Sequence, residues 1–527
     1  MSEIVNKIKS HSALTPAAIA IETEHEKISY QRLCELIESL SDWIRSERCT
    51  TLAYQLDNGW LWAALDLAGL STSVNLVPIP GFFSPIQTAH TLEDAKVDLF
   101  VTDSGFIPTR ETAQARSWAS VDFPLTSIMF TTRPAKSEAG DSTPSISCYK
   151  RDIAVADFTD TKITYTSGST GSPKGVVLGK ATVETVSASI VSAMSTIDIS
   201  KHLCVLPLAT LLENIAGLYA PLLKGVTVQI PSLDNVGLTG ASLDIEKFTR
   251  TINEAQADSV IVVPQLLTAV VALTQFEILN SKSLKMIAVG GGRVSEHLLE
   301  SAAASGLPVY QGYGLSECCS VLTLNLPADN KQGSVGKPLP HASLRINDGG
   351  EIEANGSIFS GYLGDPPMTN GWYKTGDLGH IDSDGFVYVT GRIKNLFITS
   401  FGRNVNPEWI ESALTQQPEI LQALVYGENQ PHNLALVWLR FPEADTDMTR
   451  VLAKANAELP DYARVHSWII VNGEPPADLA TPNGRLKRDS ALCHYQSMIE
   501  AHYTKNCSSP SAFIAEVSEH PTTLHRG

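Results

Sequence analysis

Residues 163–177 constrain the fold of this chain more than any other segment. They begin as an apolar strand, which leads into seven small or hydroxyl-bearing residues, Thr166–Ser172, and then into Pro173, Lys174 and Gly175. Such a loop offers backbone N–H groups and hydroxyls to phosphate oxygens, with a lysine as a point charge. It is not a Walker A loop, because Pro-Lys-Gly stands where Gly-Lys-Ser/Thr is required. The flanking strand and the ordered motif favour a phosphate site over a flexible linker.

Helical and strand patterns alternate along the first 325 residues. Tyr30–Ile44 carries apolar residues at helical spacing, which predicts an amphipathic helix. Asp98–Thr102 and Ser259–Val263 are short β-branched runs typical of buried strands. Residues 131–158 are rich in Ser, Pro, Thr and charge, and predict a loop or a domain joint. Alternation of this kind predicts α/β layers with parallel strand pairing.

The pattern changes after residue 333. Glycines separate short strand-like runs up to residue 391, which predicts antiparallel strands and turns. Residues 395–490 have strand and helix patterns of their own, beginning with a helix-like segment at Pro407–Thr415, and predict a small C-terminal domain. The tail from residue 503 has few large apolar residues, so we expect it to be poorly ordered.

Composition narrows the class of protein. The chain has 527 residues, 43% of them hydrophobic and 18% charged, and a net charge of −17. This length and composition predict a globular protein of about two to four domains. We expect no nucleic-acid or anionic-lipid partner, because both require a basic surface. Local positive groups must therefore meet any anionic substrate.

Neither export nor a membrane span is expected. The eight cysteines are scattered without metal-ligand spacing, as in reduced cytoplasmic proteins. Residues 1–12 mix charges with single apolar residues and predict no signal peptide. The most apolar stretch, Val260–Leu273, contains Pro264 and is shorter than the ~18–20 residues of a membrane helix. We therefore expect a cytoplasmic protein with no integral membrane segment.

The segment from Ile163 to Val177 resembles the phosphate-binding signature of the adenylate-forming superfamily, which includes acyl-CoA synthetases, firefly luciferase and peptide-synthetase adenylation domains. The resemblance continues in order from about residue 14 to about residue 490. It implies an α/β fold with a large multi-lobed N-terminal domain, made of two stacked α/β sheets and a β-rich lobe, hinged to a small α+β domain. The implied division is an AMP-binding domain at 1–393, a mobile cap at 394–500 and a disordered tail at 501–527.

Three further motifs resemble nucleotide-binding signatures of this superfamily. Gly290-Gly-Gly292 ends a predicted strand, and residues without side chains let a flat ring approach the backbone closely. Gln311-Gly-Tyr-Gly-Leu-Ser-Glu317 follows, and Gly371–Gly379 contains Asp377. Taken alone, each motif is equally explained by an ordinary turn or a helix cap. The resemblance assigns these residues to the nucleotide: Thr166, Ser167, Gly168, Ser169, Thr170, Gly171, Gly291, Gly292, Gly312, Tyr313, Gly314, Leu315, Asp377 and Arg392.

The same resemblance implies particular roles. Lys174 and the loop position the phosphates, Ser316 reaches the α-phosphate, and Glu317 ligates Mg²⁺. One glutamate is chemically sensible there, because a hard cation on ATP prefers one or two carboxylates plus phosphate oxygens. Asp377 and Arg392 contact the ribose, and Lys394 falls at the hinge between domains. The alternative is that neither residue has a functional role: Arg392 would then be an ordinary surface ion-pair partner, and Lys394 would be a solvated lysine.

Two segments resemble long-chain fatty acyl-CoA synthetases within the superfamily. They are Thr399–Glu408 and Leu206–Asn214, and the second has Thr210 where that branch usually carries histidine or an aromatic residue. An amino-acid substrate would need a buried counter-charge, but the matching position is Leu208. We therefore predict an acyl pocket, although core packing explains its apolar stripe equally well. The predicted pocket residues are Thr210, Leu211, Ile215 and Gly292.

The chain departs from the superfamily near its end. In Thr481–Arg488 the expected catalytic lysine is replaced by Arg485. This exchange is not conservative, because arginine is a planar fork whereas lysine is a point charge. Three interpretations remain: Arg485 acts in altered geometry, Lys487 substitutes after a register slip, or adenylation is weak and the chain mainly binds.

The resemblance implies an ATP-dependent acid–thiol ligase of the AMP-forming type. A carboxylate would attack the α-phosphate of MgATP, and a thiol would then displace AMP. We predict a fatty acyl substrate, with ATP, Mg²⁺ and coenzyme A as cofactors and with Lys174, Ser316, Glu317 and Arg485 as catalytic residues. The alternatives are transfer to the phosphopantetheine of an acyl carrier protein, and a catalytically impaired protein that binds nucleotide or acyl-adenylate.

Overall fold

The structure is a computed structural model. It describes residues 2–104, 108, 118–124, 146–151, 160–166, 173–239, 242–368, 371–401, 403–442, 446–457, 459–473, 475–476, 479–480, 486–505 and 513–515. Two predicted site elements therefore lie outside the described residues, namely residues 167–172 of the phosphate loop and Arg485.

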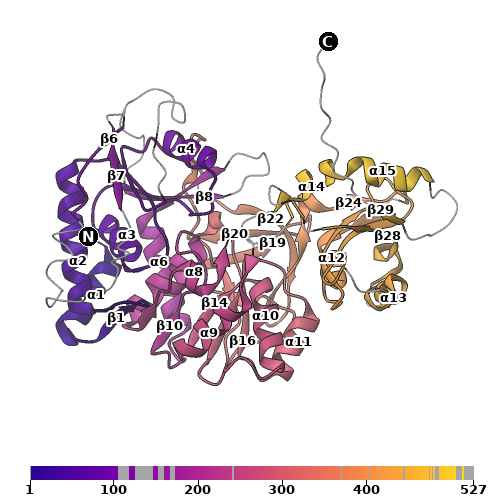
Figure 1. Ribbon diagram of the computed structural model, residues 1–527, viewed down its shortest axis with the longest axis horizontal. Helices are drawn as coiled ribbons and strands as arrows, with labels where there is room; N and C mark the ends of the chain where they lie inside the picture. Colours follow the sequence, from indigo (N-terminus) through magenta and orange to yellow (C-terminus); the bar gives the residue numbers. More distant parts are fainter. Residues whose placement is uncertain are drawn as a thin grey trace, which may run out of the picture.

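A nine-stranded sheet, called sheet A, lies in the lower half of the larger part of the molecule as drawn in Figure 1. Its six central strands pair in parallel, and antiparallel strands extend it at both edges. Parallel strands need crossover connections, which the helices supply. In spatial order the strands are β18 (Lys337–Pro338), β17 (Thr323–Leu324), β16 (Val309–Tyr313), β15 (Met286–Val289), β14 (Ser259–Val262), β10 (Lys201–Leu203), β11 (Thr227–Gln229), β1 (Ile19–Glu22) and β2 (Lys27–Ser29).

An eight-stranded sheet, called sheet B, contains the strand that enters the phosphate loop. That strand, β8, pairs in parallel with β4 and antiparallel with β9, which begins at Lys174. In spatial order the strands are β21 (Gly361–Tyr362), β9 (Lys174–Gly179), β8 (Thr161–Thr166), β4 (Asn75–Pro78), β3 (Thr51–Gln55), β5 (Leu99–Thr102), β7 (Ser147–Lys150) and β6 (Ala119–Ser120).

Helices form layers between and outside the two sheets. The largest hydrophobic cluster joins one face of each sheet to the helices between them, whereas a second cluster joins the other face of sheet A to an outer helical layer. The inner helices are α1 (Glu3–Leu14), α2 (Tyr30–Glu47), α3 (Trp60–Leu70), α6 (Lys180–Ala193), the π-helix η1 (Glu213–Tyr219) and α7 (Ala220–Lys224). The outer layer of sheet A has α9 (Ile245–Ala255), α10 (Pro264–Gln275) and α11 (Glu296–Ala304), and α4 (Pro85–Asp94) covers sheet B. Short elements complete this part: α8 (Leu233–Val236), β12 (Leu238–Thr239), β13 (Ser242–Leu243) and the 3₁₀ turn η2 (Ser316–Cys318).

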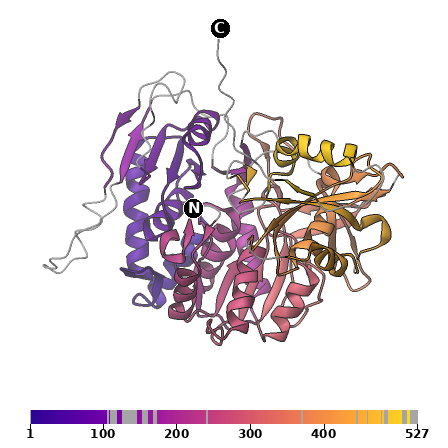
Figure 2. The same cartoon turned by 45° about the vertical axis from the view of Figure 1, so that its right-hand side comes forward.

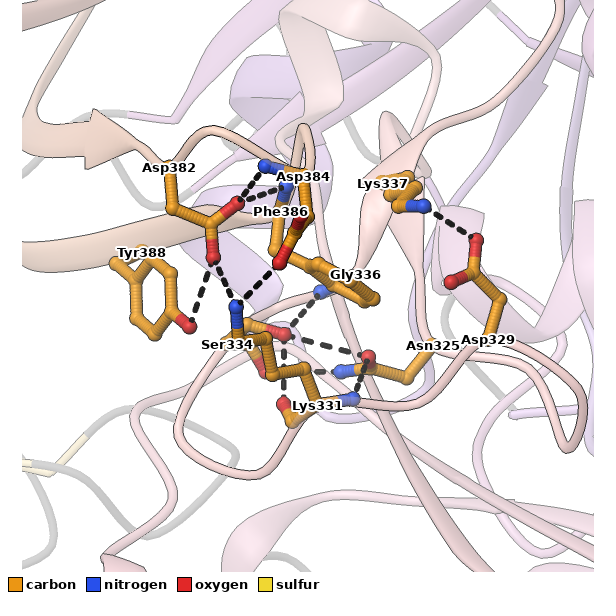
Figure 3. Close-up of polar contacts among 10 residues, drawn as sticks. All are labelled: Asn325, Asp329, Lys331, Ser334, Gly336, Lys337, Asp382, Asp384, Phe386 and Tyr388. Atoms are coloured by element: carbon orange, nitrogen blue, oxygen red, sulfur yellow. Dashed lines mark hydrogen bonds and ion pairs between the residues drawn. The ribbon is translucent and has the colours of Figure 1, made fainter.

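A four-stranded antiparallel sheet forms the predicted β-rich lobe. Its strands are β19 (Ala342–Ile346), β20 (Glu351–Gly356), β22 (Tyr373–Ile381) and β23 (Val387–Arg392). Ion pairs fasten its β22–β23 hairpin to the loop before β18: Lys331 Nζ lies 2.7 Å from Asp382 and 3.0 Å from Asp384 (Figure 3). Val335 N donates to Val387 O over 2.8 Å in the same region. These contacts fix β22 and β23 relative to sheet A.

The C-terminal elements gather at the end of the molecule opposite α1 and α2 (Figures 1 and 2). A four-stranded sheet has one hydrophobic cluster with α12 and α13 and another with α14 and α15. The elements are η3 (Ile393–Asn395), β24 (Phe397–Ile398), β25 (Asn404–Val405), α12 (Pro407–Thr415), β26 (Ile420–Tyr426), β27 (Asn433–Leu439), α13 (Met448–Ala457), η4 (Asp461–Ala463), β28 (Val465–Val471), α14 (Arg488–His494), α15 (Gln496–Lys505) and β29 (Phe513–Ala515).

The α/β fold with a small C-terminal domain agrees with the sequence prediction, and so do the segments predicted as helices at Tyr30–Ile44 and Pro407–Thr415. Two expectations differ. Strand β7 lies inside the segment predicted as a loop, because its backbone pairs with β5 and β6 despite a polar sequence. Of the predicted disordered tail, residues 501–505 continue α15 and residues 513–515 pair with β28; the rest lies outside the described residues. None of the helices in the described ranges combines the length and the apolar composition that a bilayer crossing needs.

Candidate active site

One cavity of about 260 Å³ lies between sheet A and the inner helices. Its outer end is lined by backbone and side chains of two predicted nucleotide motifs, Gly290–Gly291 and Gly312–Ser316. Its inner end is lined by residues at the opposite edge of the sheet and on α7, among them Met286 and Lys224. The same cavity therefore joins the predicted nucleotide motifs to an interior pocket.

Glu317 is held beside the strand that leaves the phosphate loop. The Tyr362 hydroxyl donates to Glu317 Oε1 over 2.7 Å, and Lys174 Nζ lies 5.5 Å from the centroid of the same phenol ring. The pairing of β21 with β9 brings these residues together, since Tyr362 lies opposite Val176. Burial, followed by the hydrogen bond to Glu317, raises the pKa of Tyr362 to about 12, so its hydroxyl remains a donor at neutral pH.

Asp377 lies in contact with both Tyr313 and Arg392. Tyr313 OH donates to Asp377 Oδ2 over 2.7 Å, and Arg392 Nε donates to Oδ1 over 2.8 Å. Asp377 is buried, and burial raises the pKa of its carboxyl although the Arg392 charge opposes this rise. Antiparallel pairing of β22 with β23 places Asp377 directly opposite Arg392.

Glycine is required for different reasons in the two turns that line the cavity, at Gly291 and at Gly314. Gly291 has φ of +72°, a left-handed conformation that favours glycine. At Gly314 a Cβ would lie 1.8 Å from the Ser320 carbonyl oxygen, so close backbone packing alone demands glycine there. Gly292, predicted for both nucleotide and acyl subsites, is not among the residues that line the cavity, whereas Gly290 is.

The predicted acyl stripe is only partly on the cavity. Thr210 and Leu211 line it, but Ile215 is fully buried in the hydrophobic core. Leu212, Ala216 and Ala220 line the cavity from this segment instead, while the Ile215 side chain packs into the core beside them. The predicted place of Ile215 in the pocket is therefore wrong, because its side chain belongs to the hydrophobic core.

A buried ion pair holds η1 against sheet B. Lys162 Nζ, on β8, lies 2.5 Å from Asp66 Oδ1 and 2.9 Å from the Tyr219 hydroxyl on η1. Asn214 Nδ2 donates to Asp66 Oδ2 over 3.1 Å, and the hydroxyls of Tyr54 and Tyr219 also donate to this carboxylate. The strand leading to the phosphate loop is thus fastened to the helix that lines the pocket.

Three buried side chains, His202, Cys204 and Glu213, form a group that the sequence did not predict, and His202 is the one of them that lines the cavity. His202 Nδ1 lies 2.8 Å from Ser259 Oγ, and His202 Nε2 lies 3.4 Å from Glu213 Oε1. Ligand atoms of His202, Cys204 and Glu213 lie within 4.8 Å of one another, close enough for a shared metal ion. No spacing in the sequence marks them, since one histidine on a strand ordinarily indicates core packing.

The junction of the two parts is built around Thr390, just before Gly391. Arg293 Nη1 donates to Thr390 O over 3.0 Å, and the side-chain amide of Asn406 donates to the same oxygen. A Cβ at Gly391 would lie 2.0 Å from Asn406 Nδ2, so this contact requires glycine. Lys394, the predicted hinge residue, is exposed in η3, and Lys487 is the N-cap residue that precedes α14.

The described residues suit magnesium and a nucleotide. Glu317 offers one carboxylate, which the Tyr362 hydroxyl orients, and Lys174 lies over the same phenol ring. Asp377 offers a second carboxylate, which accepts hydrogen bonds from Tyr313 and Arg392. Hard cations on phosphates use few protein carboxylates, and ribose hydroxyls suit an acidic acceptor.

Comparison with known proteins identifies the family. Residues 8–363 match the AMP-binding enzyme family, and residues 394–507 match the AMP-binding enzyme C-terminal domain. Similar relatives are a 2-succinylbenzoate–CoA ligase of Bacillus velezensis (29% identity, 88% of this chain, 92% of that protein) and a long-chain-fatty-acid–CoA ligase of Mycobacterium bovis (31%, 73% and 72%). An indoleacetate–CoA ligase of Aromatoleum aromaticum is 28% identical over 81% of this chain and 85% of that protein. The solved o-succinylbenzoate CoA synthetase of Bacillus subtilis, in complex with its acyl-adenylate intermediate, superposes with a TM-score of 0.72 at 24% identity over 92% and 97% of the two chains.

The chain therefore belongs to the AMP-binding enzyme family, the adenylate-forming superfamily that the sequence predicted. It is an acid–thiol ligase of the AMP-forming type, which activates a carboxylic acid as an adenylate. ATP, Mg²⁺ and coenzyme A are the cofactors of such ligases.

Proposed function

We propose that this enzyme activates an acid with an apolar body, a fatty acid in the first instance, and transfers the acyl group to coenzyme A. The continuous cavity carries this proposal, because it runs from the nucleotide motifs into a lining of mainly aliphatic side chains. The long-chain-fatty-acid–CoA ligase among the relatives supports the same choice. An aromatic acid is the second candidate, since two other relatives are named for indoleacetate and 2-succinylbenzoate.

In the first half-reaction, the substrate carboxylate attacks the α-phosphorus of ATP, and the bond to pyrophosphate breaks. Lys174 and the phosphate loop would hold the phosphates, and Glu317 would hold the magnesium ion that offsets their charge. Tyr313, Asp377 and Arg392 would bind the nucleoside. Catalysis then rests on positioning and on preorganised charge rather than on a covalent enzyme intermediate.

In the second half-reaction, a thiolate attacks the acyl carbonyl and AMP leaves. Coenzyme A is the proposed thiol, and the phosphopantetheine of a carrier protein is the alternative. We propose that the chain divides at residues 393 and 394, with Lys394 at the hinge and 394–500 as the cap. The start of the C-terminal family match at residue 394 supports this division. Exclusion of water by the cap would protect the reactive anhydride.

The test is release of pyrophosphate with a panel of fatty and aromatic acids, followed by mass spectrometry of the thioester. Release that depends on a fatty acid, and a CoA thioester as product, are the expected results. If ATP binds but no acid elicits release above background, the chain is a nucleotide-binding protein with impaired chemistry. A thioester formed only on a carrier protein would select the other acceptor.

Arg485 is proposed to take the place of the catalytic lysine. We expect Arg485→Ala to lower adenylation by roughly a hundredfold or more, as loss of one preorganised charge does. Arg485→Lys should retain much of the activity, and Lys487→Ala, the matched control, should change it little. A larger loss with Lys487→Ala than with Arg485→Ala would assign the role to Lys487 instead.

A further inference from the structure

The inner end of the cavity differs chemically from its middle. Most of the lining is aliphatic, but Lys224, His202 and Ser259 line the half remote from the nucleotide motifs. A hydrocarbon chain needs none of these polar groups. Their presence at one end of an otherwise apolar pocket indicates that the bound acid carries a second polar group there.

Strand geometry separates the two ends. Gly290 lines the outer end directly after β15, and Met286 lines the inner end at the first residue of the same strand. Four residues at about 3.3 Å each give a depth of about 13 Å along the strand. Lys224 lies at the end of α7, before the strand β11 that enters the sheet at the same edge as Met286.

Lys224 is anchored but not neutralised. Its Nζ donates to Ile197 O over 2.6 Å and to Met194 O over 3.2 Å, which uses two of the three N–H groups. Within the described part of the chain, no carboxylate forms an ion pair with it, although the protein as a whole has a net charge of −17. A methyl terminus placed against this ammonium would remove water without supplying an acceptor, and such desolvation is costly.

The second polar feature of the inner end, the pair His202 and Ser259, is also compatible with a hydrogen-bond acceptor on the substrate. Ser259 and His202 are buried and lie 2.8 Å apart on neighbouring strands. The acidic neighbour, Glu213, contacts His202 Nε2 over 3.4 Å and does not line the cavity. The imidazole of His202 therefore stands between this carboxyl and the cavity.

We propose that the enzyme activates a dicarboxylic acid, whose second carboxylate binds at the inner end of the cavity against Lys224, with His202 and Ser259 on the adjoining lining. This inference rests on the proposed function, and it refines the substrate class from a simple fatty acid to an acid with an apolar middle and two acidic ends. One carboxylate attacks ATP, while the other remains ionised and unreacted.

The experiment compares α,ω-dicarboxylic acids with monocarboxylic acids of the same chain length, using pyrophosphate release by the full-length enzyme. A length at which the diacid has at least a tenfold higher kcat/KM than its monoacid is expected. Lys224→Met should lower this diacid-to-monoacid ratio by roughly tenfold or more, as loss of one partner of a buried charge pair does. Lys224→Arg should preserve the preference, because it keeps the charge.

Lys180→Met is the matched control. Its Nζ also donates to two backbone carbonyls, Gly69 O at 3.0 Å and Thr72 O at 2.6 Å, but it does not line the cavity. The control should leave the diacid-to-monoacid ratio unchanged. If Lys224→Met does not fold, the ratio measured for Lys224→Arg and for the native enzyme still decides the matter.

Two results would overturn the inference. The first is a preference of the native enzyme for monoacids at every length. The second is an unaltered ratio in Lys224→Met, as expected for a lysine that only caps carbonyls. Release of pyrophosphate with monoacids alone would refute the diacid and leave the proposed function standing. Absence of release with every acid would refute the proposed function itself. A preference for aromatic diacids over aliphatic ones would support binding of a second carboxylate and would show that the part of the substrate between the two carboxylates is aromatic.

Discussion

The Tyr362 hydroxyl and the Glu317 carboxylate are joined by a 2.7 Å hydrogen bond, although 45 residues separate them in the sequence. The bond depends on the pairing of β21 with β9, which also brings the phenol ring to Lys174. A second contact supports it, since Phe359 N donates to Glu317 O over 2.7 Å. Tyr362 is therefore a positioning residue for the proposed magnesium ligand.

Tyr362→Phe should weaken magnesium binding more than it lowers kcat. Loss of an outer partner of a metal ligand costs roughly tenfold to a hundredfold in metal affinity. We expect the half-saturating Mg²⁺ concentration for pyrophosphate release to rise in that range, with a smaller change in kcat at saturating Mg²⁺. Tyr388→Phe is the control, because its hydroxyl donates to Asp382 over 3.3 Å on the hairpin in Figure 3. Equal Mg²⁺ curves for Tyr362→Phe and the native enzyme would contradict the assignment.

Ala216→Phe should shorten the acyl pocket. Ala216 lines the cavity from the π-helix, so a phenyl group there occupies space that a long acid needs. We expect kcat/KM for long acids to fall by roughly tenfold or more, while acids of two to four carbons are spared. Ala304→Phe, at the exposed end of α11, is the control for added bulk. A uniform loss with acids of every length would show damage to the fold instead of a blocked pocket.

The Asp66–Lys162 pair should be strongly coupled in stability. Both side chains are almost completely buried, with 0% and 1% exposure. Lys162→Met alone should lower the free energy of unfolding by about 3–5 kcal/mol, because it leaves a buried carboxylate without its counter-charge. Asp66→Leu combined with Lys162→Met should recover part of that loss, and a double-mutant cycle measures the coupling. The exposed pair Lys9–Glu38 should show almost none, and similar coupling for both pairs would refute the distinction.

Glu213 should make the fold less stable as the pH rises. Burial raises the pKa of its carboxyl above the ordinary value of 4.5, so the folded protein holds this proton more tightly than the unfolded chain does. The stability contributed by the group is complete below 4.5 and is lost as the pH climbs through the folded-state pKa. Urea unfolding of the native enzyme and of Glu213→Gln should therefore diverge with pH, with the variant gaining relative stability. Exposed Glu300→Gln is the control, and a pH-independent difference for Glu213→Gln would contradict the prediction.

The fold could be predicted well because each motif, and each helix or strand pattern, is a contiguous segment of the sequence. Pro407–Thr415 coincides with α12, and the glycine turn follows β15 as expected. Two of the nucleotide motifs, Gly290–Gly291 and Gly312–Ser316, lie together because they follow the neighbouring parallel strands β15 and β16. This convergence could be anticipated from the resemblance.

Other features could not be predicted, because they depend on contacts between distant segments or on helix type. Tyr362 gains its role only through strand pairing, and His202 and Lys224 carry no motif of their own. Ile215 lies in the core whereas its neighbour Ala216 lines the cavity, and an apolar stripe in the sequence does not distinguish two adjacent apolar residues. Gly314 shows the converse, since a motif glycine has a packing reason independent of any ligand.

The π-helix offers a route by which a one-residue deletion, rather than a substitution, could alter the shape of the acid pocket. A deletion of one residue within Glu213–Tyr219 would restore i→i+4 bonding and rotate the preceding turn relative to the Tyr219 anchor. The side chains of this segment that line the cavity, such as Ala216, would then be turned relative to the sheet, and the shape of the pocket would change without any substitution in the nucleotide motifs. Selectivity and adenylation chemistry can thus diverge independently in this scaffold.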